Sequence, residues 1–241
     1  MRIDHANVGG GARFVEIPAG WVTLSGDLST PSDARGVVLF AHGSGSSRHS
    51  PRNQAVARVL QSAGLATLLM DLLTPEEETI EMQGGMRRFD IDLLAERLVH
   101  AIDWLIVTPE TKQLRIGLFG ASTGAAAALV AAAIRPAAIH AVVSRGGRPD
   151  LAGSALPDVR APTLLIVGGN DLQVIELNRQ AFAQMRCEKR LDIIPGATHL
   201  FEEPGALEEV ARLAASWFRR YLDVTSASTE ASATPPRPRP T

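Results

Sequence analysis

Hydrophobic and polar positions alternate in two kinds of block along most of the chain. Continuous apolar runs, typical of strands buried on both faces of a sheet, occupy residues 36–43, 65–73, 114–120, 139–146, 161–171 and 189–196. Stretches in which apolar residues recur every three or four positions, typical of amphipathic helices, occupy residues 52–64, 90–106, 123–134, 172–185 and 205–222. Buried strands that alternate with helices predict an α/β fold, with a mostly parallel sheet and helices on both of its faces.

Shorter segments complete the predicted architecture. Residues 12–20 and 20–28 alternate apolar with polar positions and meet at a glycine, which predicts an antiparallel N-terminal strand pair. Residues 145–162 are too few to form a large cap domain over the sheet. The longest remaining connection, residues 72–90, is charged and contains Gly84-Gly85. It fits either a mobile flap over a site or a solvated loop.

The amino-acid composition limits which classes of protein this chain can belong to. The chain has 241 residues, 45% of them hydrophobic, so residues 1–223 can form a single domain with a sizeable core. Residues 224–241 are rich in Ser, Thr, Ala and Pro and are expected to be a disordered tail. One cysteine, Cys187, excludes an intrachain disulfide, and a net charge of −2 gives no reason to expect nucleic acid as a partner. Without a secretory signal or a membrane-spanning run, a cytoplasmic protein is expected.

A short motif at residues 120–124, Gly-Ala-Ser-Thr-Gly, stands between a predicted buried strand and an alanine-rich predicted helix. In that setting Gly-x-Ser-x-Gly is typical of a nucleophile elbow, a strained turn that holds a serine hydroxyl clear of the sheet. The glycines at 120 and 124 let the strand and the helix pass closely, and the helix N-terminus favours negative charge at the site. The alternative is a tight turn with an incidental serine, so the prediction for Ser122 depends on partners elsewhere.

A serine nucleophile needs a base and an acid, which in this topology follow it in the order Ser, acid, His. His199 lies in the loop after the last predicted strand, and Asp171 follows the strand before it. Both therefore leave the sheet at the edge where Ser122 is presented. Asp171 alone could be a turn residue, and Asp158 is the best substitute acid. His140 opens a strand at the opposite edge, so we predict a structural role for it.

Acyl chemistry also needs backbone donors for an oxyanion. The N–H of Thr123 follows the nucleophile, and the N–H of Ser44 lies in the loop after strand 36–43. His42, at the end of that strand, is predicted to shape the loop. Arg145 and Arg148 lie at the carboxyl end of strand 139–146 and could bind a substrate carboxylate or phosphate. Two alternatives stay open: Arg48 could contribute, or Arg145 could instead pair with a loop acid such as Asp150.

Together these segments resemble a known superfamily. "VVLFAHGSGSSRHSPRN", "GLFGASTGAAAAL", "LLIVGGND" and "PGATHLFEEPG" are similar to the corresponding motifs of α/β-hydrolases, and within them of bacterial dienelactone hydrolase-like proteins. The resemblance extends over about residues 12–222. It implies an α/β-hydrolase fold and a hydrolytic site at Ser122, Asp171 and His199. Dienelactone hydrolases carry cysteine at the elbow, so the serine here favours ordinary esters over dienelactones as substrates.

The sequence therefore predicts a serine hydrolase that cleaves carboxylic esters of small to medium acyl groups through an acyl-enzyme. Its expected partner is a small-molecule ester, it needs no cofactor or metal, and a homodimer is possible. An acyltransferase or thioesterase would use the same triad with another acceptor. A non-catalytic binding protein on the same fold is the alternative outside enzymology.

Overall fold

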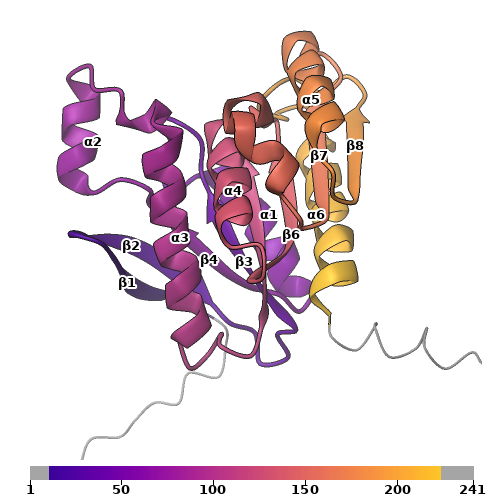
Figure 1. Ribbon diagram of the computed structural model, residues 1–241. Helices are drawn as coiled ribbons and strands as arrows, with labels where there is room; N and C mark the ends of the chain where they lie inside the picture. Colours follow the sequence, from indigo (N-terminus) through magenta and orange to yellow (C-terminus); the bar gives the residue numbers. More distant parts are fainter. Residues whose placement is uncertain (1–10, 224–241) are drawn as a thin grey trace, which may run out of the picture.

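The computed structural model describes residues 11–223 and contains one eight-stranded sheet (Figure 1). Its strands run in the order β1-β2-β4-β3-β5-β6-β7-β8. Their bounds are β1 Arg13–Ala19, β2 Val22–Ser29, β3 Gly36–Ala41, β4 Ala66–Met70, β5 Arg115–Ala121, β6 Ile139–Arg145, β7 Thr163–Gly168 and β8 Lys189–Ile194. The predicted C-terminal tail, residues 224–241, lies outside the described residues.

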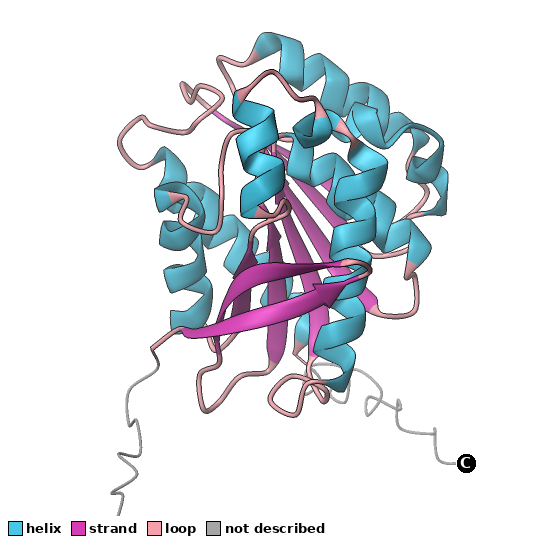
Figure 2. Cartoon of the chain, turned by 90° about the vertical axis from the view of Figure 1, so that its left-hand side faces the viewer, coloured by secondary structure: helices cyan, strands magenta, loops and turns pink. Residues whose placement is uncertain are grey.

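The N-terminal strands β1 and β2 form the predicted antiparallel pair. They join at Gly20, whose φ of 66° is left-handed, a conformation that glycine adopts without strain. Strand β2 also pairs antiparallel with β4, and every other pairing in the described sheet is parallel. Figure 2 shows the β1–β2 pair crossing the remaining strands at a steep angle, as the twist of such a sheet requires.

Helices cover both faces of the sheet, which confirms the predicted fold class. Helices α3 (Ile91–Val107), α4 (Thr123–Ile134) and α5 (Leu172–Gln184) lie on one face, and α1 (Pro51–Ser62) and α6 (Ala206–Leu222) on the other (Figure 1). Each face of the sheet packs a hydrophobic core against its helices, and alternate residues of β3 point into one core or the other. Val37 and Leu39 join the core under α3 and α4, whereas Val38 and Phe40 join the core under α1 and α6. Both faces of a central strand are buried, so its sequence is a continuous apolar run.

Residues 72–90 contain more structure than predicted. They form helix α2 (Pro75–Met82) and the 3-10 turn η1 (Arg87–Phe89). A capping box starts α2: Thr74 Oγ1 accepts from Glu77 N–H, and the Glu77 carboxylate accepts from Thr74 N–H at 2.9 Å. The alternative of a solvated loop is contradicted by this helix, whereas motion of the segment as a flap stays a prediction. A second 3-10 segment, η2 (Pro149–Asp158), follows β6.

Among the helices within residues 11–223, none has the length and apolar character that crossing a bilayer requires.

Candidate active site

Ser122 sits at a strained turn between β5 and α4. Its φ of 51° and ψ of −123° are unusual for a residue with a side chain, and such strain is held only where surrounding contacts enforce it. Those contacts are backbone hydrogen bonds. Ser122 N–H donates to the Arg145 carbonyl at 3.3 Å, and the Ser122 carbonyl accepts from the N–H groups of Ala125 at 3.1 Å and Arg148 at 3.0 Å. The turn is thus fixed to the end of β6 as well as to its own helix.

The two motif glycines have the close approaches that the sequence predicted. A Cβ on Gly124 would overlap the carbonyl oxygens of Ala41 and His42 at the end of β3, and a Cβ on Gly120 would overlap the backbone of Ala125. No side chain fits at either position because the neighbouring atoms are backbone and cannot rotate away. Helix α4 can therefore start directly above the strand, with its N-terminus at Ser122.

Asp171 and His199 are brought together by the loops after β7 and β8. The Nδ1 of His199 lies 2.7 Å from Oδ2 of Asp171; the His199 side chain is 40% exposed and the Asp171 side chain 15%. Asp171 occupies the N-cap position of α5, yet its carboxylate binds the imidazole instead of capping the helix. The two loops are held in register because Gly169 N–H donates to Ile194 O and Asn170 N–H donates to Ala197 O.

Ser122 and His199 both lie next to the Arg145–Gly146 segment. A Cβ added to Gly146 would lie 3.6 Å from Cε1 of His199, and Gly146 directly follows Arg145, whose carbonyl holds the Ser122 N–H. Within residues 11–223 the Ser122 hydroxyl makes no hydrogen bond, so it is available to a substrate. Asp158, the substitute acid, is exposed at the end of η2 and is not the carboxylate that binds His199.

The predicted oxyanion donors lie beside the elbow. A Cβ on Gly43 would stand 3.7 Å from Ser122 Oγ, so the loop after β3 borders the hydroxyl. Thr123 is the first residue of α4, and its side chain reaches across to this loop: Ser44 N–H donates to Thr123 Oγ1 at 3.0 Å. The second predicted donor is therefore already engaged. An oxyanion could use it only if the Thr123 hydroxyl moved away.

His42 has the structural surroundings that the sequence predicted. Its Nδ1 lies 2.9 Å from the Gly43 carbonyl, and its Nε2 accepts from Leu72 N–H at 3.1 Å. One nitrogen thus donates and the other accepts, which describes a neutral ring. Burial lowers the pKa of His42, in agreement with that state. His42 ties the end of β3 to the chain after β4. His140 lies at the opposite end of β6, with Nδ1 at 3.0 Å from the Ala138 carbonyl.

The arginines near the site differ in their partners. Arg148 forms a bidentate ion pair with Asp150, at 2.9 and 2.8 Å, which contradicts the alternative in which Arg145 pairs with Asp150. Asp150 is closer along the chain to Arg148, and both leave the sheet in the same loop. Arg145 itself is 7% exposed. Arg48 pairs with Asp71 and lies 3.4 Å from Asp27, so its charge is satisfied within the fold.

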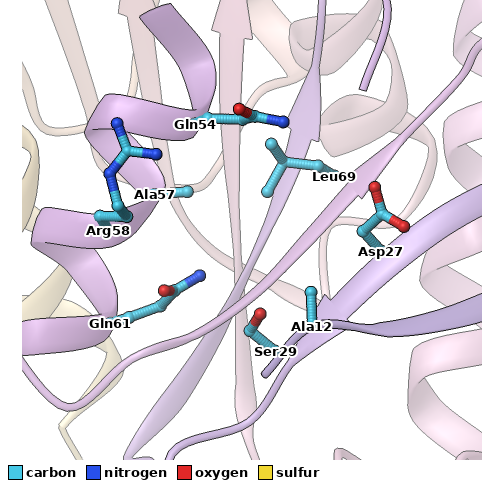
Figure 3. A pocket seen from close by; sticks show the side chains of 8 residues that line it. All are labelled: Ala12, Asp27, Ser29, Gln54, Ala57, Arg58, Gln61 and Leu69. Atoms are coloured by element: carbon cyan, nitrogen blue, oxygen red, sulfur yellow. The ribbon is translucent and has the colours of Figure 1, made fainter. Parts of the chain in front are cut away.

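A cleft between the loop after β3 and helix α2 adjoins the elbow. Its cavity of about 580 Å³ is bordered by residues that include Gly45, Ser46, Arg48, Leu73, Met82 and Arg88. A smaller cavity shares four residues with it and reaches Gly43, which borders Ser122. The sequence did not reveal this cleft because half of its lining residues come from residues 72–90, which were not predicted to fold as a helix. Another cavity, about 200 Å³ between α1 and strands β2 and β4 (Figure 3), is lined by no predicted site residue.

Three features define an α/β-hydrolase. They are the order of the strands, the serine at a strained strand–helix turn, and the His–Asp contact at the carboxyl edge of the sheet. Comparison with known families then gives the particular group. The model of the dienelactone hydrolase family matches residues 24–227, and the chain belongs to that family.

Comparison with individual proteins gives a dienelactone hydrolase among the similar solved structures. A solved structure of dienelactone hydrolase from Anabaena variabilis is 63% identical, has a TM-score of 0.87, and covers 88% of this chain and 99% of its own. The solved structure of Est1E from Butyrivibrio proteoclasticus is 17% identical with a TM-score of 0.71, covers 87% of this chain and 98% of its own, and shares the fold. A curated protein of Mycobacterium tuberculosis, provisionally named a phosphoribosyl transferase, is 58% identical over 208 residues. These cover 86% of this chain and 46% of the relative, so the chain spans about half the length of the curated relatives it matches.

Proposed function

We propose that this protein is a serine hydrolase that cleaves carboxylic esters through an acyl-enzyme. The observation that carries the proposal is the His199–Asp171 contact of 2.7 Å beside a serine held at a strained turn. An imidazole oriented by a carboxylate is the base that a serine hydroxyl needs in order to act as a nucleophile. Membership of a hydrolase family supports the same reading.

The proposed reaction begins with proton transfer. With Nδ1–H donating to Asp171, the Nε2 of His199 accepts the Ser122 proton as Oγ attacks the ester carbonyl carbon. The resulting oxyanion is held by the N–H of Thr123 and by that of Ser44, once the Thr123 hydroxyl releases the latter. The imidazolium protonates the leaving alcohol, and an acyl-Ser122 ester remains. Water that loses a proton to His199 then releases the carboxylic acid.

The cleft beside the elbow supports small to medium substrates. Its volume of about 580 Å³ lies within the range of small-molecule sites. Leu73, Pro75 and Met82 give it apolar surface, whereas Ser25 and Ser46 offer hydroxyl groups. An acyl chain could therefore lie along α2 while the carbonyl stays at the elbow.

The transferase name of the Mycobacterium tuberculosis relative belongs to a protein about twice as long as the matched segment. The matched 208 residues correspond to the part of this chain that carries the hydrolase-family motifs. We infer that any phosphoribosyl transfer by that relative would reside in its other half, and that the shared segment contributes hydrolase chemistry.

Covalent labelling tests the proposal. A fluorophosphonate should modify Ser122 stoichiometrically in the wild type, as mapped by mass spectrometry. Ser122→Ala should abolish labelling, His199→Ala should slow it strongly, and kcat/KM for 4-nitrophenyl butyrate should fall by about 10³-fold or more in either variant. Added thiol or alcohol acceptors would reveal a thioesterase or acyltransferase by the products formed.

Controls separate chemistry from folding. His140→Ala, at the opposite edge of the sheet, should label at the wild-type rate. Thermal unfolding of each variant reports whether it is folded. Absence of labelling in folded wild-type protein would overturn the proposal and favour a non-catalytic binding protein.

A further inference from the structure

Asn178 is a fully buried amide on the inner side of α5, with an exposed fraction of 0%. Its Nδ2 donates to the Gly147 carbonyl at 3.0 Å and to the Val174 carbonyl at 2.8 Å. Its Oδ1 is buried without a hydrogen-bond partner within residues 11–223. A buried acceptor without a donor lowers stability, and an apolar side chain of similar size would avoid that cost. The fold therefore keeps an amide here for the two bonds that it donates.

The bond to Gly147 reaches the elbow through a single peptide group. The Gly147 carbonyl and the Arg148 N–H belong to one planar peptide unit, and in a trans peptide they point in opposite directions. The Arg148 N–H donates to the Ser122 carbonyl at 3.0 Å. The plane of this peptide is therefore held from both sides, by Asn178 at its carbonyl and by Ser122 at its N–H.

A second peptide group continues the series toward the site. The Ser122 carbonyl shares its peptide unit with the N–H of Thr123, which is the first proposed oxyanion donor. Because this peptide is also trans, the Thr123 N–H points away from the carbonyl that Arg148 binds. The other donor to this carbonyl, Ala125 N–H at 3.1 Å, belongs to α4 itself. The bond from Arg148 thus comes from outside the helix and sets the tilt of the donor peptide.

Packing leaves the first of these peptides little freedom except rotation. A Cβ added to Gly147 would overlap Ser144 Oγ on β6 and Ala125 Cβ in the first turn of α4. These two neighbours fix the position of Gly147, and the Asn178 amide then fixes the direction of its carbonyl. Asn178 also lies on the helix whose N-cap is Asp171, the residue that binds the proposed base. Helix α5 therefore contacts both halves of the proposed catalytic machinery.

We propose that Asn178 is a positioning residue for the oxyanion donor, acting on the Thr123 N–H through two peptide groups in series. This inference rests on the proposed esterase function and adds a residue that tunes its transition state. The amide binds the carbonyl of the Gly147–Arg148 peptide, whose N–H binds the carbonyl of the Ser122–Thr123 peptide. Hydrogen bonds in series polarise one another, so negative charge that develops on the substrate oxygen strengthens every bond in the series.

Asn178→Leu tests the series because it removes the donor and keeps a similar volume. With 4-nitrophenyl butyrate, kcat should fall about tenfold while KM stays within about twofold, since the lost interaction acts on the transition state. The inhibition constant of 1,1,1-trifluoro-2-hexanone, whose adduct with a serine carries an oxyanion, should rise about tenfold as well. If Asn178→Leu fails to fold, Asn178→Ser carries the same comparison, because its shorter hydroxyl donates to the Val174 carbonyl and leaves Gly147 unbound.

Labelling with a fluorophosphonate separates positioning from damage to the fold. Loss of positioning should leave every Ser122 reactive, with full stoichiometry and a rate constant about tenfold below wild type. Partial unfolding would instead lower the stoichiometry, and the folded molecules would still label at the wild-type rate. Gln61→Leu is the matched control. It removes an amide donor on α1 that binds Thr67 Oγ1 at 2.7 Å away from the elbow, and it should leave kcat and the labelling rate within about twofold of wild type.

Other outcomes overturn the inference. Wild-type kcat and an unchanged inhibition constant in folded Asn178→Leu would show that the amide does not act on the oxyanion donor. Reduced labelling stoichiometry at the wild-type rate, or a rise in KM alone, would make Asn178 a structural residue. Failure of wild-type labelling at Ser122 is a separate result, because it contradicts the esterase itself.

Discussion

The elbow around Ser122 and the α2–η1 segment both lie beside the loop after β3, but different forces hold them in place. The contacts around the elbow are between main-chain atoms. Ser122 forms backbone hydrogen bonds with residues of β6 and α4, and Gly124 lies against the carbonyl groups at the end of β3. No ion pair is needed there, since hydrogen bonds and close contact between main-chain atoms define the geometry.

The α2–η1 segment depends on side-chain charges instead. Glu77 accepts from Arg97 at 3.1 Å and from Arg87 at 2.7 Å, and the almost fully buried Glu81 accepts from Arg88 at 3.0 Å. Apolar side chains of this segment face outward, namely Ile80, Met82, Met86 and Phe89. The segment has little apolar core of its own.

This difference predicts which substitutions each of the two regions tolerates. The elbow should tolerate changes of charge but no added volume, because its neighbours are main-chain atoms that cannot rotate away. The α2 wall should tolerate added volume on its exposed side but no loss of a buried carboxylate, because Glu77 binds two arginines and Glu81 binds one.

The largest effect is expected from Gly124→Ala. The added Cβ would overlap the carbonyl oxygens of Ala41 and His42, so β3 and α4 must separate. We expect the free energy of unfolding in urea to fall by at least about 3 kcal/mol, and fluorophosphonate labelling of Ser122 to be lost. Gly45→Ala is the matched control: its Cβ would meet open space, and only a φ of 70° opposes it, at about 1 kcal/mol. Similar losses in both variants would contradict the close-approach explanation.

A smaller and more local effect is expected from Glu77→Ala. Arg97 and Arg87 lose their shared acceptor and α2 loses its capping box, at about 2 kcal/mol. Limited proteolysis should then cut residues 73–90 faster than the rest of the domain, while labelling of Ser122 persists. Glu76→Ala, an exposed neighbour, should leave the cleavage pattern as in wild type. An unchanged pattern in Glu77→Ala would show that ion pairs do not hold this wall.

The smallest effect is expected from Thr123→Val, which tests the contact between the elbow and the loop after β3. Loss of the Ser44 N–H to Thr123 Oγ1 bond should lower the free energy of unfolding by about 1 kcal/mol. Because that N–H becomes free for the oxyanion, kcat/KM for a neutral ester should change by less than about threefold. Thr123→Ser keeps the hydroxyl and serves as the reference. A tenfold loss of kcat/KM in Thr123→Val would mean that the hydroxyl itself takes part in the reaction.

Much of the fold was predictable because each buried strand is an unbroken apolar run. Strand β3 and helix α4, for example, begin or end within a residue or two of the predicted limits. The positions of Ser122, Asp171 and His199 followed from topology, since parallel strands bring the residues after them to one edge. Their catalytic roles stay predictions until labelling tests them.

Side-chain pairing was less predictable. Arg145 and Arg148 lie at the carboxyl end of the same strand, and the sequence contains nothing that decides which of them binds Asp150. Helix α2 was missed because its charged residues indicate a solvated surface when read along the chain, whereas the fold buries Glu77 and Glu81 against arginines from α3 and η1.

The sequence by itself determined the class of fold, the strand–helix order and the edge where a site could form, because those features depend on local periodicity and on which residues follow each strand. Tertiary structure alone decided that Arg145 is buried without a carboxylate, that Ser44 N–H is engaged by Thr123, and that α2 walls a cleft. The physical reason is distance along the chain. Hydrogen bonds and ion pairs act over a few ångströms in space, and their partners become neighbours only when the sheet has formed.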